Sequence, residues 1–290
     1  MCRMILSVRK NTSRLAVIGE LGQYPLWRRA LEFSLKYNWH LVRNSSSDTL
    51  ISDAFSEMKL LASKGLDCWY TRIDKIKSLL NIESFSSYMK HRTVCRTITK
   101  TINSKFDRWW LDEINKLKKN GCVCPNDHNK LRFYKQFKGS LTVEPYIELI
   151  RNRNQRQYLS RFRVGSHNLR VESGRWTFPR TKLEDRKCLY CQSGQIDTEQ
   201  HFITECSLTQ NNRNCFYNIL GDLDKNFVSL DNLDKLKYIL CPVDSVHAKL
   251  SNKYLGLLVK TRDYHDQGKP ISSVETISLS DTGIQLIYNS

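Results

Sequence analysis

The sequence contains few of the residues that interrupt helices: there are only six prolines and twelve glycines among 290 residues. This scarcity disfavours a strand-and-turn architecture and favours long helices. No uninterrupted apolar run approaches the roughly 18 residues that a membrane-spanning helix requires. The first apolar run ends at Arg9 and Lys10, too early for a secretory signal. We therefore expect a protein of a reducing compartment, cytoplasmic or nuclear and not secreted, with no membrane partner.

Residue patterns of common catalytic centres are also missing. A polymerase that uses two metal ions needs clustered carboxylates, normally including adjacent aspartates, and the sequence has no Asp-Asp pair. It has no Gly-x-Ser-x-Gly turn, no phosphate-binding loop ending in Gly-Lys-Ser/Thr and no His-Glu-x-x-His helix. The expectation is a protein that is not an enzyme by itself and takes no small-molecule substrate.

What the sequence does have is positive charge, unevenly distributed. The formal net charge is +17, and residues 85–187 alone hold 24 lysines and arginines against nine acidic residues. The 103 residues that follow hold nine basic and twelve acidic residues. A concentrated positive field attracts a polyanion, so the middle of the chain predicts binding to RNA or DNA. A well-solvated surface with no specific partner is the alternative explanation of the same charge.

Apolar periodicity predicts a mainly α fold. Expected helices cover residues 25–41, 48–65 and 67–80, a long basic stretch at 85–120, an arginine-faced stretch at 143–163, and three shorter segments at 208–220, 232–240 and 244–262. The expected domains are a helical bundle at 1–84, a basic helical connector at 85–150, an arginine-rich helix with a small zinc-binding knuckle at 151–222, C-terminal helices at 223–263 and a flexible tail at 264–290.

The arginine-faced helix and the segment after it supply the expected phosphate contacts, because an apolar stripe opposite cations lets a helix dock while facing a phosphate backbone. A helix lying on a membrane surface would have a similar pattern. The expected nucleic-acid-binding residues are Arg151, Arg153, Arg156, Arg161, Arg163, His167, Arg170, Arg175, Arg186 and Lys187. For His167, a hydrogen bond that stabilises its loop is an equally good expectation.

A metal site is the most specific signal in the sequence. Cys188 and Cys191 are separated by two residues, and His201 and Cys206 follow after nine and four more. Two close cysteines plus two ligands from another element complete a tetrahedral zinc site, and four protein ligands leave no position for catalysis. The expected cofactor is therefore one structural Zn2+, with a helix that Asp197 caps and that ends or loosens before Cys206.

Other cysteines give weaker candidates. Cys122, Cys124 and His128 form a poorer set, because one intervening residue strains the chelate and no fourth ligand is evident. Cys215 is an alternative to Cys206 in the main set. The remaining cysteines in helical stripes are most simply core residues.

Several separated segments, in the same order, resemble the C-terminal part of the reverse transcriptases of non-LTR (LINE-like) retrotransposons. They are residues 159–175, with Arg163-Val-Gly-Ser-His-Asn-Leu169, then Arg186-Lys-Cys-Leu-Tyr-Cys191, then Asp197-Thr-Glu-Gln-His201 through Cys206. Residues 5–26 are similar to the segment just after the polymerase palm. The resemblance implies a thumb-like bundle in residues 1–84 and a CCHC zinc knuckle, with basic helices that hold template RNA and target DNA.

The chain departs from that family in lacking the catalytic aspartate pair and any endonuclease. The function expected from the sequence is thus a non-catalytic nucleic-acid-binding fragment of a retrotransposon reverse transcriptase. The alternative is a zinc-containing protein-interaction module whose charge only keeps it soluble.

Overall fold

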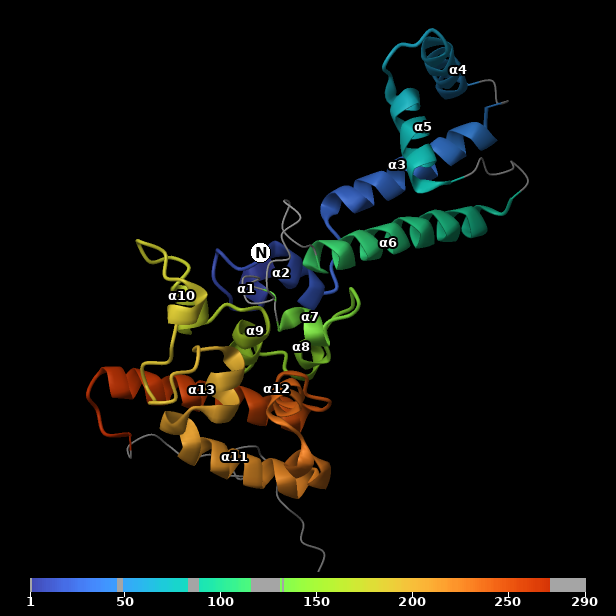
Figure 1. Ribbon diagram of the computed structural model, residues 1–290. Coiled ribbons are helices and arrows are strands. Elements are labelled where there is room, and N and C mark those ends of the chain that lie inside the picture. The colour runs from blue at the N-terminus through green and yellow to red at the C-terminus, as the bar shows by residue number, and fades with distance from the viewer. Residues whose placement is uncertain (1, 46–48, 83–88, 116–130, 132, 272–290) are drawn as a thin grey trace, which may run out of the picture. The chain divides into compact units, whose positions relative to one another are not determined.

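A computed structural model describes residues 2–45, 49–82, 89–115, 131 and 133–271 (Figure 1). The described residues are mainly helical, as expected, and contain no named strand; two isolated bridges join Leu21 to Val143 and Lys187 to Ile196. The chain divides into two compact units, which we call unit 1 (residues 1–22 and 114–290) and unit 2 (residues 23–113). None of the described helices combines the length and the apolar character needed to cross a membrane.

Unit 2 is built on three helices that the sequence predicts and on most of a fourth. These are α3 (Leu26–Arg43), α4 (Leu50–Ser63), α5 (Trp69–Leu80) and α6 (His91–Asn115), the last continuing past the boundary between the units. Every fourth residue of α6 from Val94 to Ile114 is apolar and at most 3% exposed. Val94, Ile98 and Ile102 pack with Leu35 and Trp39 of α3. This stripe determines which side of α6 faces the core.

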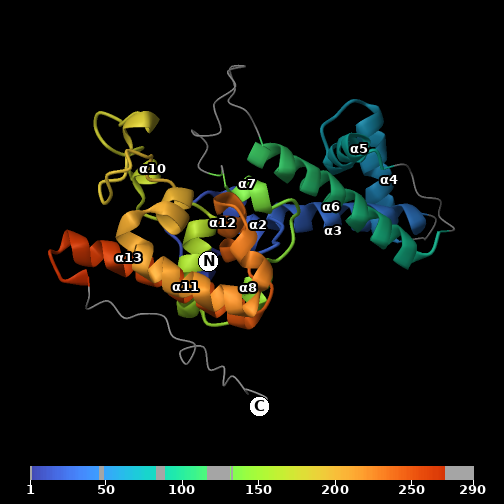
Figure 2. The same cartoon turned by 60° about the horizontal axis from the view of Figure 1, so that its bottom comes forward.

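Unit 1 packs around its last long helix, as Figure 2 shows. Its helices are α1 (Cys2–Ile5), α2 (Arg14–Glu20), α7 (Tyr134–Phe137), α8 (Pro145–Leu149), α9 (Gln157–Arg163), α10 (Arg170–Ser173), α11 (Gln210–Leu223), α12 (Asn232–Leu240) and α13 (Ser245–Asp266), with short η turns between them. Tyr254 and Leu258 of α13 lie in one buried cluster with Leu159, Phe162 and Phe216. Gly256 lets α13 approach α9, because a Cβ there would lie 2.9 Å from the Tyr158 ring.

The units divide the chain differently from the expected domains. Residues 1–22 belong to unit 1, although the sequence placed them in a bundle at 1–84. They are held there by long-range contacts: the Arg161 Nε–H donates to the carbonyl of Ser7 at 3.0 Å, and Thr12 Oγ1 donates to Ser166 Oγ at 2.9 Å. Residues 91–113, expected in a separate connector, join unit 2 through the stripe of α6.

The arginine-faced helix expected at 143–163 is not continuous. It is divided into α8, the single turn η2 (Arg153–Gln155) and α9. At the break, Arg156 Nη1 donates to the backbone carbonyls of Ile147, Ile150 and Arg151 at 3.2, 2.6 and 3.0 Å. The guanidinium thus supplies donors to carbonyls that a continuous helix would have satisfied internally. Arg156, expected at a phosphate, is buried in this role.

Arg163 is the centre of a buried polar network in unit 1. Its side chain is fully buried; Nε and Nη2 donate to the two carboxylate oxygens of Glu20 at 2.9 and 3.0 Å. Arg163 also forms an ion pair with Glu144, and Nη1 donates to the carbonyl of Leu240 at 2.7 Å. Glu20 in turn accepts a hydrogen bond from Tyr146 at 2.6 Å. Burial alone would lower the pKa of Arg163, but Glu20 and its other partners raise it well above the ordinary value, so the side chain is cationic.

Candidate metal centre and basic surfaces

The first two candidate ligands lie on a short hairpin. Its arms are joined by hydrogen bonds from Cys188 N–H to the carbonyl of Gln195 and from Asp197 N–H to the carbonyl of Arg186, both at 2.9 Å. Gly194 turns the chain with a φ of +68°, a value that favours glycine. The Tyr190 N–H points at Cys188 Sγ at 3.5 Å. The hairpin therefore holds Cys188 and Cys191 on one tight turn, as a metal knuckle requires.

The second two ligands flank one π-helical turn, η4 (His201–Glu205). The Cys206 N–H donates to the carbonyl of His201 at 2.7 Å, an i→i+5 bond that is rare outside functional sites. The wider turn brings residues five apart closer to one face than an α-helix would, and the helix then ends at Glu205. This confirms the expectation that the helix ends or loosens before Cys206.

The cap of this helix differs from the expectation. Thr198 Oγ1, and not Asp197, accepts the hydrogen bond from His201 N–H at 3.1 Å. The Asp197 carboxylate instead accepts from the Arg170 N–H at 2.8 Å and pairs with the Arg262 guanidinium at 2.6 and 3.0 Å. A fully buried carboxylate is better compensated by a guanidinium than by a single backbone donor.

The four candidate ligand atoms lie together. Cys188 Sγ, Cys191 Sγ, His201 and Cys206 Sγ all lie within 4.8 Å of one another. Cys188 and Cys206 sulfurs are 3.9 Å apart, and Cys191 Sγ is 3.3 Å from His201 Nε2. For tetrahedral bonds of about 2.3 Å to sulfur and about 2.0 Å to nitrogen, ligand separations of roughly 3.5–3.8 Å are expected. These residues could bind a metal ion with little rearrangement.

The cluster is electrostatically prepared for a cation. The hydrogen bond between the two sulfurs, together with burial, raises the pKa of Cys188 to about 11, and the same bond lowers the pKa of Cys206 to about 7. The contact between the two sulfurs therefore favours the thiolate form of Cys206. Burial alone would lower the pKa of His201, but the neighbouring Cys188 and Cys191 raise it. A metal ion would replace these protons with a stronger common partner.

Two residues that the sequence did not single out support the ligands. Gln195 Oε1 lies 2.5 Å from His201 Nδ1, so this nitrogen donates and leaves Nε2 free to face the sulfurs. Arg262 of α13 lies 3.9 Å from Cys188 Sγ and stacks between the rings of Tyr190 and Phe202. A lone arginine on an otherwise apolar face of α13 is the only sequence signal for this role.

The alternative fourth ligand, Cys215, does not contribute to the cluster. Cys215 lies outside the group of four, and Cys206 occupies the fourth position. Cys122, Cys124 and His128 fall outside the described residues.

The structure separates the ten expected nucleic-acid contacts by exposure. Arg151, Arg153 and Lys187 are exposed, Arg161, Arg170 and Arg175 are half-buried, and Arg156, Arg163, His167 and Arg186 are buried. His167 Nε2 contacts Glu199 at 2.9 Å, which corresponds to the loop-stabilising alternative. Arg186 donates to the carbonyls of Thr181 and Val171. The expectation that Arg156, Arg163 and Arg186 face phosphates is therefore corrected, because these side chains are buried and donate to partners within unit 1; for His167 the loop-stabilising alternative holds.

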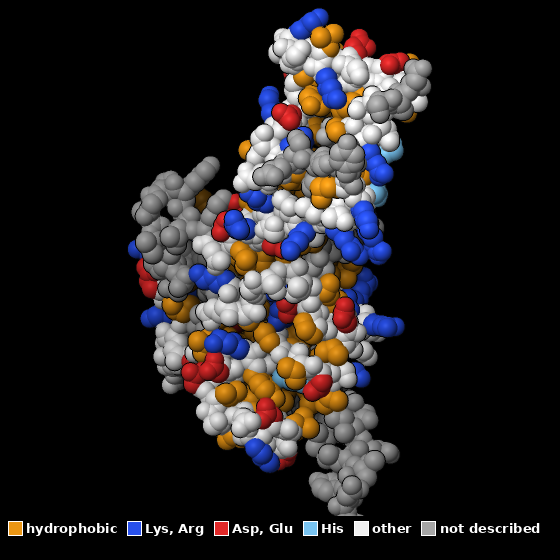
Figure 3. Space-filling view, turned by 90° about the vertical axis from the view of Figure 1, so that its right-hand side faces the viewer, with side chains coloured by type: hydrophobic (Ala, Val, Ile, Leu, Met, Phe, Trp, Pro, Cys, Tyr) orange, Lys and Arg blue, Asp and Glu red, His pale blue; other side chains and the backbone are white. Residues whose placement is uncertain are grey.

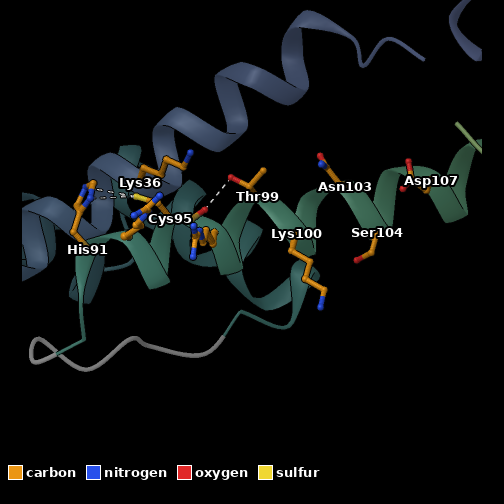
Figure 4. A pocket seen from close by; sticks show the side chains of 10 residues that line it. Lys36, His91, Cys95, Thr99, Lys100, Asn103, Ser104 and Asp107 are labelled. Atoms are coloured by element: carbon orange, nitrogen blue, oxygen red, sulfur yellow. Dashed lines mark hydrogen bonds between the residues drawn. The ribbon is translucent and has the colours of Figure 1, made fainter. Parts of the chain in front are cut away.

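A row of exposed cations lies instead on α6. Arg92, Arg96, Lys100 and Arg108 are exposed and spaced by multiples of four residues. This row is displaced by two residues, about 200° of helix rotation, from the buried stripe, so it lies on the opposite side. Arg92, Arg96 and Lys100 line an open groove of about 910 Å3. The groove extends along α6 from His91 to Asp107 and is completed by Lys36 of α3 (Figure 4).

On the face that Figure 3 shows, lysine and arginine side chains are spread among acidic and apolar ones. Cations at four-residue spacing repel one another by about 0.2–0.5 kcal/mol per pair in isolated helices. No ion pair within the described part of the chain neutralises Arg92, Arg96 or Lys100. The row on α6 is thus a concentrated positive surface that a polyanion would stabilise.

Comparison with known proteins produced no match: no family model, curated protein or solved structure is significantly similar to this chain.

Proposed function

We propose that this chain is a non-catalytic nucleic-acid-binding module, related to the C-terminal part of a non-LTR retrotransposon reverse transcriptase. It grips template RNA or target DNA through exposed cations, and a structural zinc ion holds the fold of unit 1. The observation that carries the proposal is the row of Arg92, Arg96, Lys100 and Arg108 opposite the buried stripe of α6. Phosphates spaced along a strand neutralise such a row and release counterions.

Zinc is the metal that the ligand set favours. Three thiolates and one imidazole match the CCHC class of structural zinc sites, whereas iron–sulfur clusters favour cysteine alone. Cys188, Cys191, His201 and Cys206 would fill all four positions, which leaves none for a reactive water. The ion would hold the hairpin and the π turn together, so its role would be to stabilise the fold of unit 1.

A protein-interaction module is the second candidate, because unit 2 also exposes apolar side chains. Phe33, Tyr37, Leu50 and Ile51 are at least half exposed and line one groove. Nucleic-acid binding is preferred because Arg92, Arg96, Lys100 and Arg108 stay exposed on one side of α6, whereas several other cations of the middle third are used in buried contacts. The salt dependence of binding separates the two candidates.

Replacing Arg92, Arg96 and Lys100 by alanine is expected to weaken binding to a single-stranded oligonucleotide in a salt-dependent way. If the parent protein neutralises about six phosphates, log affinity falls with log salt at a slope of roughly −4. Loss of three contacts should reduce that slope by about two units. Fluorescence anisotropy of a labelled 20-mer, measured at several salt concentrations, gives both values.

The matched control replaces three exposed lysines of the acidic C-terminal third, Lys225, Lys249 and Lys269. It removes the same formal charge and should change the slope by less than half a unit. Equal effects of the two triple variants would mean that net charge alone attracts the strand. A parent slope near zero would favour the protein-interaction module.

We also expect no DNA synthesis by the chain alone, with either Mg2+ or Mn2+, because it offers no adjacent aspartates to hold two metal ions. Primer extension on an RNA template is the assay, and the same preparation must shift that template in a binding gel. Primer-extension activity that copurifies with the protein through two further columns would contradict the proposal.

A further inference from the structure

The loop that follows α10 exposes two large aromatic side chains. Trp176 is 71% exposed and Phe178 is completely exposed, at 103%. Figure 1 shows this segment, in yellow, projecting from unit 1 beside α10. Side chains of this size normally bury 150–250 Å2 and dominate cores and interfaces. Two exposed aromatic side chains separated by one residue therefore indicate a binding surface, whereas a single exposed leucine is ordinary.

The base of this loop, residues 174–182, is firmly held, so the exposure is not the result of a loose chain. The buried Arg186 donates from Nε and Nη2 to the carbonyl of Thr181 at 3.1 and 2.8 Å, and from Nη1 to that of Val171 at 2.8 Å. Thr177 Oγ1 accepts from Thr181 N–H at 2.9 Å and contacts its hydroxyl at 2.8 Å. The Arg186 guanidinium and the hydroxyls of Thr177 and Thr181 thus form a clamp that fixes both ends of the loop.

Gly174 makes room for this clamp. A Cβ at position 174 would lie 2.9 Å from the Cγ and Cδ atoms of Arg186 and from the carbonyl oxygen of Arg170. Arg186 lies two residues before the metal ligand Cys188, and its carbonyl accepts from the Asp197 N–H within the hairpin. The clamp of the loop is therefore continuous with the candidate metal centre.

The charges of the loop select the partner. Residues 174–182 contain Arg175, Arg180 and Lys182 and no acidic residue; Arg180 and Lys182 are exposed, and Arg175 pairs with Glu172. Glu184 and Asp185 follow in the next turn. Proteins that bind single-stranded nucleic acids use this arrangement: the bases stack on aromatic side chains, and the phosphates pair with neighbouring cations.

We propose that loop 174–182 is a stacking platform for unpaired bases, with Trp176 and Phe178 as the stacking faces and Arg180 and Lys182 as phosphate contacts. This rests on the proposed nucleic-acid binding and specifies its substrate: single strands with accessible bases, read without sequence preference. The row on α6 recognises phosphates alone, so the two surfaces respond differently to removal of the bases.

The test compares two strands of equal charge. The full chain, loaded with zinc, is titrated with a 20-residue oligodeoxythymidine and with an abasic strand of the same length. We expect the parent to bind the base-bearing strand at least about tenfold more tightly, since each stacked base is worth a factor of about five or more. Trp176→Ala with Phe178→Ala should reduce this preference to less than about threefold while leaving the affinity for the abasic strand unchanged.

Two further variants keep the result interpretable. Trp176→Phe with Phe178→Tyr retains aromatic faces and should retain the preference. Val228→Ala with Val243→Ala removes two other exposed apolar side chains (65% and 76%) and should have no effect. In the parent, the thymidine strand should also quench an emission component that disappears on Trp176→Phe, a readout that does not depend on a truncated side chain.

The outcomes separate this inference from the proposed function. Equal affinity of the parent for both strands would overturn the stacking platform and leave phosphate binding intact. Binding to neither strand at low salt would overturn both proposals. If the double alanine variant keeps its base preference but loses binding to vesicles of phosphatidylcholine with 30% phosphatidylserine, the loop is a membrane contact and the inference is wrong.

Discussion

If the cluster holds zinc as proposed, removal of the ion is expected to unfold the segment between η3 (Leu183–Asp185) and η5 (Ser207–Thr209) and to destabilise unit 1 more than any single substitution in unit 2. This segment contains one isolated bridge and one π turn, and in the hairpin that holds Cys188 and Cys191 only Ile196 packs against the main apolar cluster of unit 1. The candidate ligands Cys188, Cys206 and His201 in this segment are at most 6% exposed. Structural zinc supplies about 10–16 kcal/mol in small zinc domains, because the site does not exist in the unfolded chain.

The expected result has two parts. Protein purified without added metal should contain about one zinc per chain, and Cys188→Ser with Cys191→Ser should lose it. In this double variant, hydrogen exchange should become fast at the backbone amides of positions 188, 197 and 206, each of which donates to a carbonyl in the native fold. Elemental analysis and exchange mass spectrometry measure the two parts independently.

Cys95→Ser with Cys215→Ser is the matched control, since both cysteines are half-buried and lie outside the cluster. This control variant should retain about one zinc per chain and the hydrogen-exchange pattern of the parent protein. The stripe of α6 in unit 2 should keep its protection in every variant, because no candidate ligand lies there. Zinc content that is unchanged by the loss of Cys188 and Cys191 would rule out the assigned ligands.

The cysteine–histidine cluster could be predicted from the sequence because its information is local. All four candidate ligands fall within nineteen consecutive residues, and the five-residue step from His201 to Cys206 already indicated that a regular α-helix could not continue. The helices of unit 2 were predictable for a similar reason, since the apolar stripe of α6 repeats every four residues. Such patterns depend on the backbone period and need no knowledge of distant partners.

The environment of each arginine could not be predicted in the same way. Arg163 and Arg161 are neighbours on α9, yet the first is fully buried and the second is half-buried. The difference is made by Glu20, which lies 143 residues earlier in the chain. Arg163 is buried because residues 1–22, which include Glu20, pack in unit 1. Sequence periodicity predicts neither this packing nor the burial.

Arg163→Met is expected to lower the free energy of unfolding of unit 1 by about 3–5 kcal/mol, the usual cost of removing one partner from a buried ion pair. Methionine fills a similar volume against Phe137 and Tyr146, whose rings the guanidinium covers. The loss therefore comes from charge. Glu144 keeps Lys138 as a partner, whereas among the described residues Glu20 has no ion pair besides that with Arg163 and keeps the hydroxyl of Tyr146.

Glu20 is consequently the residue whose neutralisation should compensate. In the double variant Arg163→Met with Glu20→Gln, part of the lost stability should return, so the two effects should be non-additive by at least about 1 kcal/mol. Arg163→Lys keeps the charge, but its single nitrogen cannot reproduce the two-nitrogen pairing of Nε and Nη2 with Glu20, so its stability should fall between those of the parent and the methionine variant. Denaturant unfolding followed by hydrogen exchange of unit 1 amides provides the values.

Arg161→Met is the control on the same helix. Its guanidinium donates one hydrogen bond from Nε to the carbonyl of Ser7 and lies near the Tyr158 ring, so its loss should cost no more than about 1.5 kcal/mol. If both arginines instead faced phosphates, each variant would weaken oligonucleotide binding and leave unfolding unchanged. A parent-like stability of Arg163→Met with reduced affinity for a single strand would show that Arg163 belongs to the binding surface, and the network around Glu20 would then need another cation.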